Sequence, residues 1–156
     1  MAKTKPIRDA LRANFYPYAF SLGFEVDKQS HPGFVVFRRF TADKVHIFEI
    51  QWDKYHRPKF VINFAEAPLE GVEFGGKHFG AKDLLPVHCG TYRRLLRDQG
   101  RFSYRWFQLR RPLVEQVLLL SRNYDPDEIA TQVIQRFNEL EDWWANKNIG
   151  KHIERY

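Results

Sequence analysis

The chain has few of the features that stabilise or anchor a secreted or membrane protein. It contains one cysteine, Cys89, among 156 residues, so no internal disulfide can form and a reducing compartment is the simplest interpretation. The first residues lack the apolar run of a signal peptide. The longest aliphatic run, residues 117–120, is far shorter than the roughly 20 residues of a membrane helix. We therefore expect a cytoplasmic protein that does not contact a membrane.

The chain also lacks the short motifs of common enzyme classes: it has no HExxH, paired CxxC, GxSxG or GxGxxG pattern. Residues 71–77 have the glycine and lysine spacing of a phosphate-binding loop, but His78 stands where Ser or Thr would bind magnesium, so we interpret this segment as a glycine loop. His88 and Cys89 are adjacent and have no second cysteine to complete a metal site, so we predict that Cys89 is a buried structural thiol. We accordingly expect no cofactor and no metal ion, and we lean towards a protein that is not an enzyme.

Apolar and aromatic residues, by contrast, are abundant. Hydrophobic residues make up 44% of the chain, aromatic residues 16% and charged residues 28%. This composition excludes a disordered chain, and a domain of this length buries about 70% of its unfolded surface. No repeat or low-complexity tract divides the sequence, so we expect residues 1–156 to form a single α+β domain.

The first half of the sequence predicts a helix followed by antiparallel strands. Residues 5–22 have apolar side chains at helical spacing, with Pro17 placed to kink the helix and Gly23 placed to end it. Three segments rich in aromatic and branched residues follow, joined by short turns that favour antiparallel hairpins. They are residues 34–40, 45–52 and 60–64, with a weaker strand at 24–28.

The second half begins irregularly and ends in helices. Glycine and proline predict irregular chain over residues 65–90, residues 87–97 fit either a strand or a short helix, and residues 102–109 are predicted to be a strand. Apolar side chains nearly surround a short helix opened by Pro112, which predicts that it is mostly buried. The last helix begins at a capping box, with Asp125 as its N-cap. The whole pattern predicts an antiparallel sheet of four to six strands, with an N-terminal helix and two C-terminal helices packed on one face.

The net charge of +6 comes from one segment. Residues 90–111 contain seven arginines and one acid, Asp98, and the rest of the chain sums to zero. Arginine offers a planar fork to carboxylate or phosphate, and aromatic residues are interleaved with these arginines. One interpretation is an anion-binding surface; the other is a solvated surface whose arginines cover rings and pair with acids. The anion-binding candidates are Arg93, Arg94, Arg97, Arg101 and Arg105.

Asn63 is a polar residue within an apolar strand segment. A buried asparagine must satisfy two amide donors and one carbonyl. It is therefore either a structural pin bonded to nearby backbone or a ligand-binding residue on the open face of the sheet. In the preceding strand, His46 and Glu49 fall on opposite faces, so they do not form a catalytic pair.

Several short segments carry a family resemblance. They are Leu22-Gly23-Phe24, the aromatic strand 34–40, Ile50-Gln51, the strand around Asn63, Arg94-Leu95-Leu96 and residues 106–109. Over residues 7–110 the chain resembles a family of small bacterial proteins catalogued as domain of unknown function 4304. The resemblance implies no established activity and no catalytic residues, and some relatives look like immunity or regulatory proteins. The chain departs from the family at Pro17 and in its longer helical end after Pro112.

Three functions follow from these observations. The favoured one is a non-enzymatic module that binds a protein partner, immunity-like or regulatory, because no nucleophile, base and orienting group occur together. The alternative is a binder of nucleic acid, another polyanion or a phosphate ligand that uses residues 90–111. The second alternative is an enzyme whose site assembles from distant residues, with a deep polar pocket around His46, Glu66 or His88 as its sign.

Overall fold

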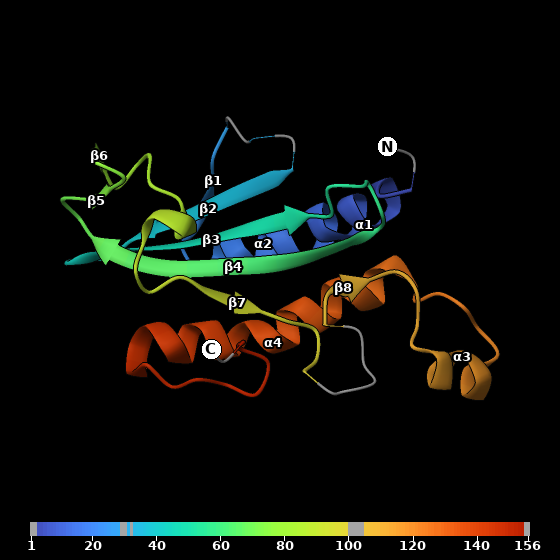
Figure 1. Cartoon of the computed structure of the whole chain (residues 1–156). Helices are drawn as coiled ribbons and strands as arrows, with labels where there is room; N and C mark the ends of the chain where they lie inside the picture. The colour runs from blue at the N-terminus through green and yellow to red at the C-terminus, as the bar shows by residue number, and fades with distance from the viewer. Residues whose placement is uncertain (1–2, 29–30, 32, 100–104, 155–156) are drawn as a thin grey trace.

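The computed structural model describes residues 3–28, 31, 33–99 and 105–154, and its centre is a six-stranded antiparallel sheet (Figure 1). The strand order is β1-β2-β3-β4-β7, and β8 pairs with the first residues of β4 on the same edge as β7. The strands are β1 (Glu25–Val26), β2 (Phe34–Phe40), β3 (Lys44–Trp52), β4 (Lys59–Pro68), β7 (Arg93–Leu95) and β8 (Phe107–Gln108). The predicted α+β class is confirmed.

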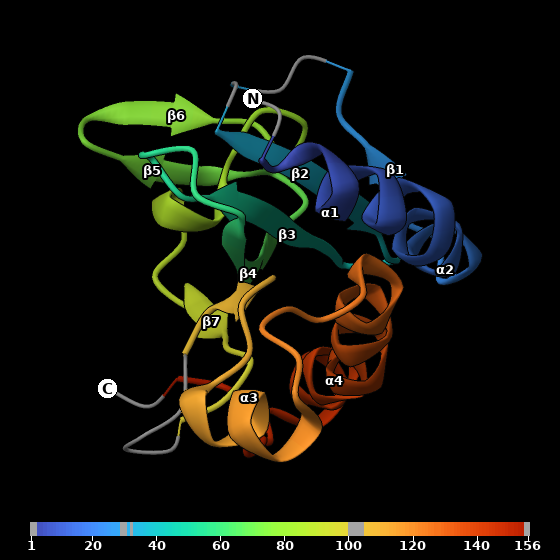
Figure 2. The same ribbon diagram turned by 90° about the vertical axis from the view of Figure 1, so that its right-hand side faces the viewer.

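Helices cover one face of this sheet (Figure 2). The N-terminal helical run consists of α1 (Lys5–Ala10), the π-helical segment η1 (Leu11–Phe15) and α2 (Tyr16–Ser21). Pro17 has no N–H to donate, and the irregularity predicted around it takes the form of this π-helical turn. Gly23, with φ of +91°, follows the helix in the left-handed region, as its position predicts.

The long C-terminal helix α4 (Pro126–Asn146) packs beside the N-terminal helices on the same face. Its predicted capping box is confirmed: Asp125 accepts from the Asp127 amide at 2.9 Å, and the Asp125 amide donates to Glu128 at 2.8 Å. The apolar stripe that the sequence predicts for this helix faces inward and is buried. It comprises Ile129, Val133, Phe137, Leu140 and Trp144.

Phenylalanine rings fill the core between the helices and the sheet. Phe37 and Phe48, opposite each other on β2 and β3, stack with ring centroids 4.6 Å apart. Phe137 of α4 meets Phe48 edge-on at 5.1 Å. The wholly buried rings include Phe15, Phe24, Phe37, Phe48, Phe60, Phe64, Phe107 and Phe137.

Residues 69–92 cross the opposite face and are more regular than predicted. They contain a hairpin, β5 (Val72–Phe74) and β6 (Lys77–Phe79), whose turn uses Gly75 and Gly76 at positive φ. The glycine spacing therefore serves a hairpin, as a glycine loop rather than a phosphate-binding loop. A short 3₁₀ helix η2 (Pro86–His88) precedes β7, so residues 87–97 contain the end of a helix as well as a strand.

Two predictions for the second half are wrong. The sequence predicts a strand over residues 102–109, of which residues 102–104 lie outside the described residues. The described part forms a strand only at Phe107–Gln108, and Arg105 and Trp106 lie in a bend. The short helix α3 (Leu113–Leu119) exists, but none of its residues is buried and it projects away from the sheet (Figure 1). No helix in the described part of the chain has the length and apolar character needed to cross a membrane.

Candidate functional site

The helix α3 presents its apolar side chains to solvent. Six large apolar residues between positions 113 and 120 are 57% to 93% exposed, whereas most other aliphatic residues of the protein are buried. A contiguous exposed apolar patch of this kind is typical of an interaction site. We call this patch the apolar α3 surface; it consists of Leu113, Val114, Val117, Leu118, Leu119 and Leu120.

The polar side of α3 faces the domain, which explains why the burial prediction failed. The Glu115 carboxylate accepts from the Tyr124 hydroxyl at 2.6 Å and forms ion pairs with Arg97 and Arg111 at 3.5 and 3.7 Å. The Gln116 amide donates to the Arg111 carbonyl at 2.7 Å. Because these polar groups fix the helix, the apolar face is left outward.

Two arginines flank the apolar α3 surface. Arg110 and Asn123 pair in an isolated β-bridge, and the Arg111 amide donates to the Arg122 carbonyl at 2.8 Å, so the two ends of the α3 segment meet at its base. Arg110 and Arg122 are exposed, and within the described residues neither has a carboxylate at ion-pair distance. The surface is therefore apolar with a cationic border.

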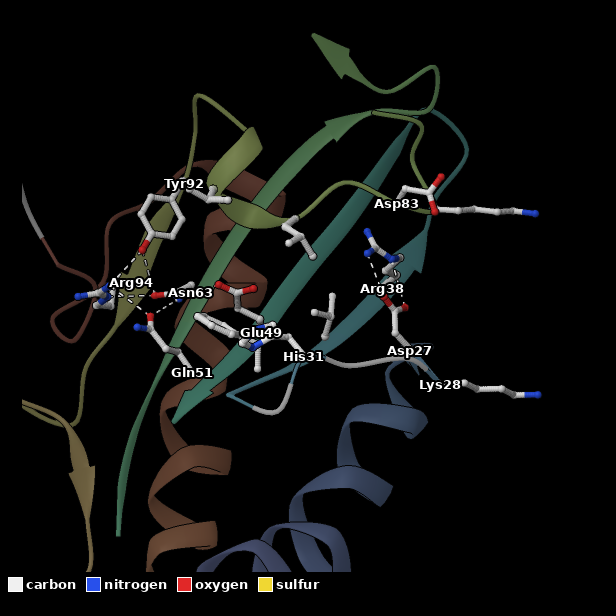
Figure 3. Close-up of a pocket in the computed structure, with 15 residues that line it drawn as sticks. Asp27, Lys28, His31, Arg38, Glu49, Gln51, Asn63, Asp83, Tyr92 and Arg94 are labelled. Atoms are coloured by element: carbon white, nitrogen blue, oxygen red, sulfur yellow. Dashed lines mark hydrogen bonds and ion pairs between the residues drawn. The ribbon is translucent and has the colours of Figure 1, made fainter. Parts of the chain in front are cut away.

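A separate polar pocket of about 840 Å³ lies on the other face of the sheet, between the strands and residues 82–92 (Figure 3). Its floor is one row of directly opposed residues across four strands: Val36 on β2, Glu49 on β3, Asn63 on β4 and Arg94 on β7. Neighbouring strands are about 4.8 Å apart, so this register places a carboxylate, an amide and a guanidinium side by side.

Asn63 is the centre of a hydrogen-bond network in this pocket. Its amide nitrogen donates to Glu49 and Gln51, each at 2.8 Å, and its carbonyl accepts from Arg94 Nε at 3.0 Å and the Tyr92 hydroxyl at 3.3 Å. Asn63 is 1% exposed and its polar atoms are all engaged. The partners are side chains rather than the backbone groups that the pin interpretation assumed.

Glu49 is a buried carboxylate on the floor of the pocket without an ion-pair partner among the described residues. Its carboxylate accepts from Asn63. Burial raises the pKa of Glu49, although the Asn63 hydrogen bond and the charges of Arg94 and Arg38 oppose this shift. Figure 3 shows Glu49 between the Asn63 network on one side and Arg38 on the other.

Arg38 also lines the pocket, and its guanidinium already has hydrogen-bond and ion-pair partners within the protein. Its guanidinium binds the Asp27 carboxylate in a two-pronged ion pair, with distances of 3.2 and 2.9 Å. It also donates to the carbonyls of Ala81 and Leu84, which holds the covering segment on the sheet. Arg38 is thus a structural cation rather than a free one.

The structure does not bring the anion-binding candidates together. Arg94 enters the pocket, whereas Arg93 belongs to a row on the helix-covered face. Arg97 is buried against Tyr124, and Arg105 forms an ion pair with Glu154 at 2.7 Å. Arg101 lies outside the described residues.

The three residues considered as the sign of an enzyme site are also dispersed, and none of them lines the pocket; they are His46, Glu66 and His88. His46 and Glu66 are cross-strand partners on the helix-covered face, where Glu66 binds Lys44 and Lys147. His88 stacks on Phe79 on the opposite side of the sheet. His46 and Glu49 lie on opposite faces, as predicted.

The sequence pointed to Asn63 and Arg94 but missed their partners. Glu49 and Gln51 alternate along β3 and so point to one face, which is a readable signal. Tyr92 gave no such signal, because its position depends on how a loop crosses the sheet.

Comparison with models of known protein families, with curated proteins and with solved structures found no match for this chain.

Proposed function

We propose that this protein is a non-enzymatic module that binds a protein partner through the apolar α3 surface. The observation that carries the proposal is the orientation of α3, whose polar residues bind the domain while its leucines and valines face solvent. Apolar surface left in water contributes little to folding but favours association with a partner that covers it. The sequence resemblance implies an immunity-like or regulatory role, and a protein in either role acts by binding a partner protein.

The chemistry of the surface defines the partner's side of the interface. Leu113 and Val117 are four residues apart on α3, and Leu120 follows at its left-handed C-cap, so the helix presents an apolar stripe of the kind that lies in an apolar groove. Arg110 and Arg122 border this stripe and favour acidic side chains at the groove's edges. The expected partner therefore presents an apolar groove with an acidic rim.

Charge argues against other occupants. A second copy would join two chains of net charge +6, each with Arg110 and Arg122 at the edge of the same surface. An anionic membrane would attract these arginines but would repel the exposed acids at the start of α4, Asp125, Asp127 and Glu128, which stand next to the α3 segment. A protein with acidic residues placed only where the arginines lie avoids both conflicts.

The two alternative functions have less support. Binding of a polyanion through residues 90–111 would have to displace the carboxylates that bind Arg97, Arg105 and Arg111. An enzyme assembled around His46, Glu66 or His88 would need a pocket that holds them, but none of the three lines the polar pocket, and His88 lies on the opposite face of the sheet from His46 and Glu66. We therefore favour the protein partner over both.

The test begins with affinity purification of the full chain from a lysate of its source organism and identification of bound proteins by mass spectrometry. Each candidate is then purified and titrated against the chain by isothermal titration calorimetry. We expect one protein to bind, the Val117→Glu/Leu118→Glu variant to abolish binding, and Arg110→Ala/Arg122→Ala to weaken it and reduce its salt dependence.

Leu69→Glu is the matched control, because Leu69 is an exposed leucine remote from α3 in the sequence and should tolerate the same charge. Binding that survives the α3 double substitution would contradict the proposal. So would a wild-type dimer that the substitution dissolves, flotation with anionic vesicles that the substitution prevents, or failure of every purified candidate to bind.

A further inference from the structure

We infer that the pocket on the open face of the sheet binds a small zwitterion, a molecule that carries an ammonium and a carboxylate a few bonds apart on an apolar body. Free amino acids and short peptides are the chemical class. This inference is independent of the apolar α3 surface, which lies elsewhere on the molecule (Figures 1 and 3).

The first step is an imbalance of charge within the pocket. Glu49 is 4% exposed, and the hydrogen bond to its carboxylate comes from the neutral amide of Asn63. Arg94 donates to Asn63, Tyr92 and Gln51, all of them neutral groups, and no carboxylate of the described residues lies at ion-pair distance. Charges withdrawn from water without a counter-ion are unfavourable. The floor of the pocket therefore offers one place for a cation and one for an anion, while the other charged lining residues without an ion pair among the described residues, Lys28, Lys82 and Asp83, are exposed to solvent.

The second step is the distance between these two places. Asn63 separates Glu49 from Arg94, because its nitrogen donates to the carboxylate and its carbonyl accepts from the guanidinium. The two charges thus stand apart by the width of one amide group and two hydrogen bonds. Amino and carboxylate groups on one small molecule span a comparable gap, so a single ligand can meet both charges while the Asn63 hydrogen bonds stay intact.

The third step is the apolar lining. Phe34, Val36, Leu85 and Val87 line the same pocket and can cover an aliphatic or aromatic side chain. Val87 is 53% exposed at the pocket, so this wall opens to solvent and gives a ligand access. An apolar body held by such a wall, with two charged ends on the floor, describes an amino acid with a large apolar side chain.

The same features disfavour a phosphate ligand. Glu49 would repel the phosphate from the floor of the pocket, and Arg38, the second guanidinium there, is already bound by Asp27. On the floor of the pocket a phosphate would therefore find one free guanidinium beside a carboxylate, since the lining residues Lys28 and Lys82 are exposed to solvent. A zwitterion uses both groups.

The test is calorimetric titration of the full chain with the standard L-amino acids and with dipeptides of leucine and phenylalanine, supported by thermal unfolding. Two leucine analogues, 3-methylbutylamine and 4-methylpentanoate, each keep the apolar body and one charge. We expect at least one zwitterion to bind and raise the unfolding temperature, and both analogues to bind about tenfold more weakly or not at all.

Variants separate the floor of the pocket from its surroundings. Glu49→Gln keeps the side-chain shape and Arg94→Gln leaves a shorter neutral side chain, and each should lower affinity about tenfold or more. The matched controls Glu70→Gln and Arg12→Gln, at residues that do not line the pocket, should leave affinity unchanged. Thermal unfolding without ligand checks that each variant is folded. Val87→Trp narrows the pocket at a half-exposed position, so it tests the site even where a floor variant does not fold.

Several outcomes would overturn the inference. These are the absence of binding for every amino acid and dipeptide at millimolar concentration, equal binding of the single-charge analogues, or affinity that Glu49→Gln, Arg94→Gln and Val87→Trp all leave unchanged. Tighter binding of inorganic phosphate or a nucleotide would also overturn it. The Val117→Glu/Leu118→Glu variant should bind the zwitterion as wild type does, which separates failure here from failure of the proposed partner interface.

Discussion

The indole ring of Trp144 lies flat against the imidazole ring of His46, with centroids 4.9 Å apart and planes 7° from parallel. The indole N–H donates to the Ala65 carbonyl at 3.1 Å, which fixes the ring on β4. On the imidazole, Nδ1 lies 2.8 Å from the guanidinium of Arg39, which can only donate, so this nitrogen accepts. Burial and then the charge of Arg39 lower the pKa of His46 to about 4.

This pKa predicts an acid-sensitive step in stability. The unfolded chain binds a proton at His46 near pH 6.5, whereas the folded chain resists it down to about pH 4. The free energy of unfolding should therefore fall as the pH drops from 6.5 to 4, by roughly 1–2 kcal/mol from this residue, because water screens part of the effect at a ring that is not fully buried. Urea unfolding of wild type and His46→Phe at each pH measures the difference, since phenylalanine keeps the stacking and cannot titrate.

The expected result is a shallower decline for His46→Phe across that window. The pKa of His88 is also lowered by burial, so some decline should remain in both proteins, and the contribution of His46 is the difference between them. Parallel curves for the two proteins would show that His46 titrates normally in the folded state.

Truncation of the aromatic core should be costly. Phe137 is wholly buried and contacts the rings of Phe15, Phe24 and Phe48. Phe137→Ala and Trp144→Ala should each lower the free energy of unfolding by about 3–5 kcal/mol, the range for buried large aromatics. Urea denaturation measures the loss, and changes below about 1 kcal/mol would contradict this description of the core.

Substitutions on α3 should have the opposite outcome. Leu118→Gln and Leu120→Gln remove apolar side chains that are 74% and 93% exposed, so each should change stability by less than about 0.5 kcal/mol. The same urea experiment applies. A loss as large as that of Phe137→Ala would mean that α3 packs against the domain in solution, as the sequence predicted.

Asn63→Ala should destabilise the protein even without a ligand. The change leaves the buried carboxylate of Glu49 without its hydrogen-bond donor and removes the acceptor of Arg94. An unsatisfied buried polar group costs about 1–3 kcal/mol, and more when it is charged. Thermal and urea unfolding measure the effect, and a neutral result would show that water replaces the amide at no cost.

Cys89 should be chemically inert in the folded protein. It is buried, its thiol donates to the Leu85 carbonyl at 3.6 Å, and burial raises its pKa to about 11. Labelling with a thiol reagent should be slow in buffer and rapid in urea, and Cys89→Ala should keep partner binding. Immediate labelling of the native protein would contradict the burial.

Local chemistry determined the elements of this fold. The capping box at Asp125 forms the start of α4 because its bonds join residues that are close in sequence. Strand period two likewise determined that Phe60, Ile62 and Phe64 face the core while Asn63 faces away. The irregular turn near Pro17 and the left-handed Gly23 follow from the covalent structure of proline and glycine.

Tertiary structure decided how these elements meet, and with them both candidate sites. The row of Glu49, Asn63 and Arg94 depends on the register of three strands and on β7 joining the edge of β4, which no single segment encodes. The outward face of α3 depends on Glu115 reaching Tyr124 and Arg97, contacts that outweigh an apolar pattern present all round the helix. Propensity and periodicity act within a segment, whereas strand register and side-chain pairing act between segments. The sequence by itself therefore predicted the helices and most strands, and the packing decided which side chains meet in the two candidate sites.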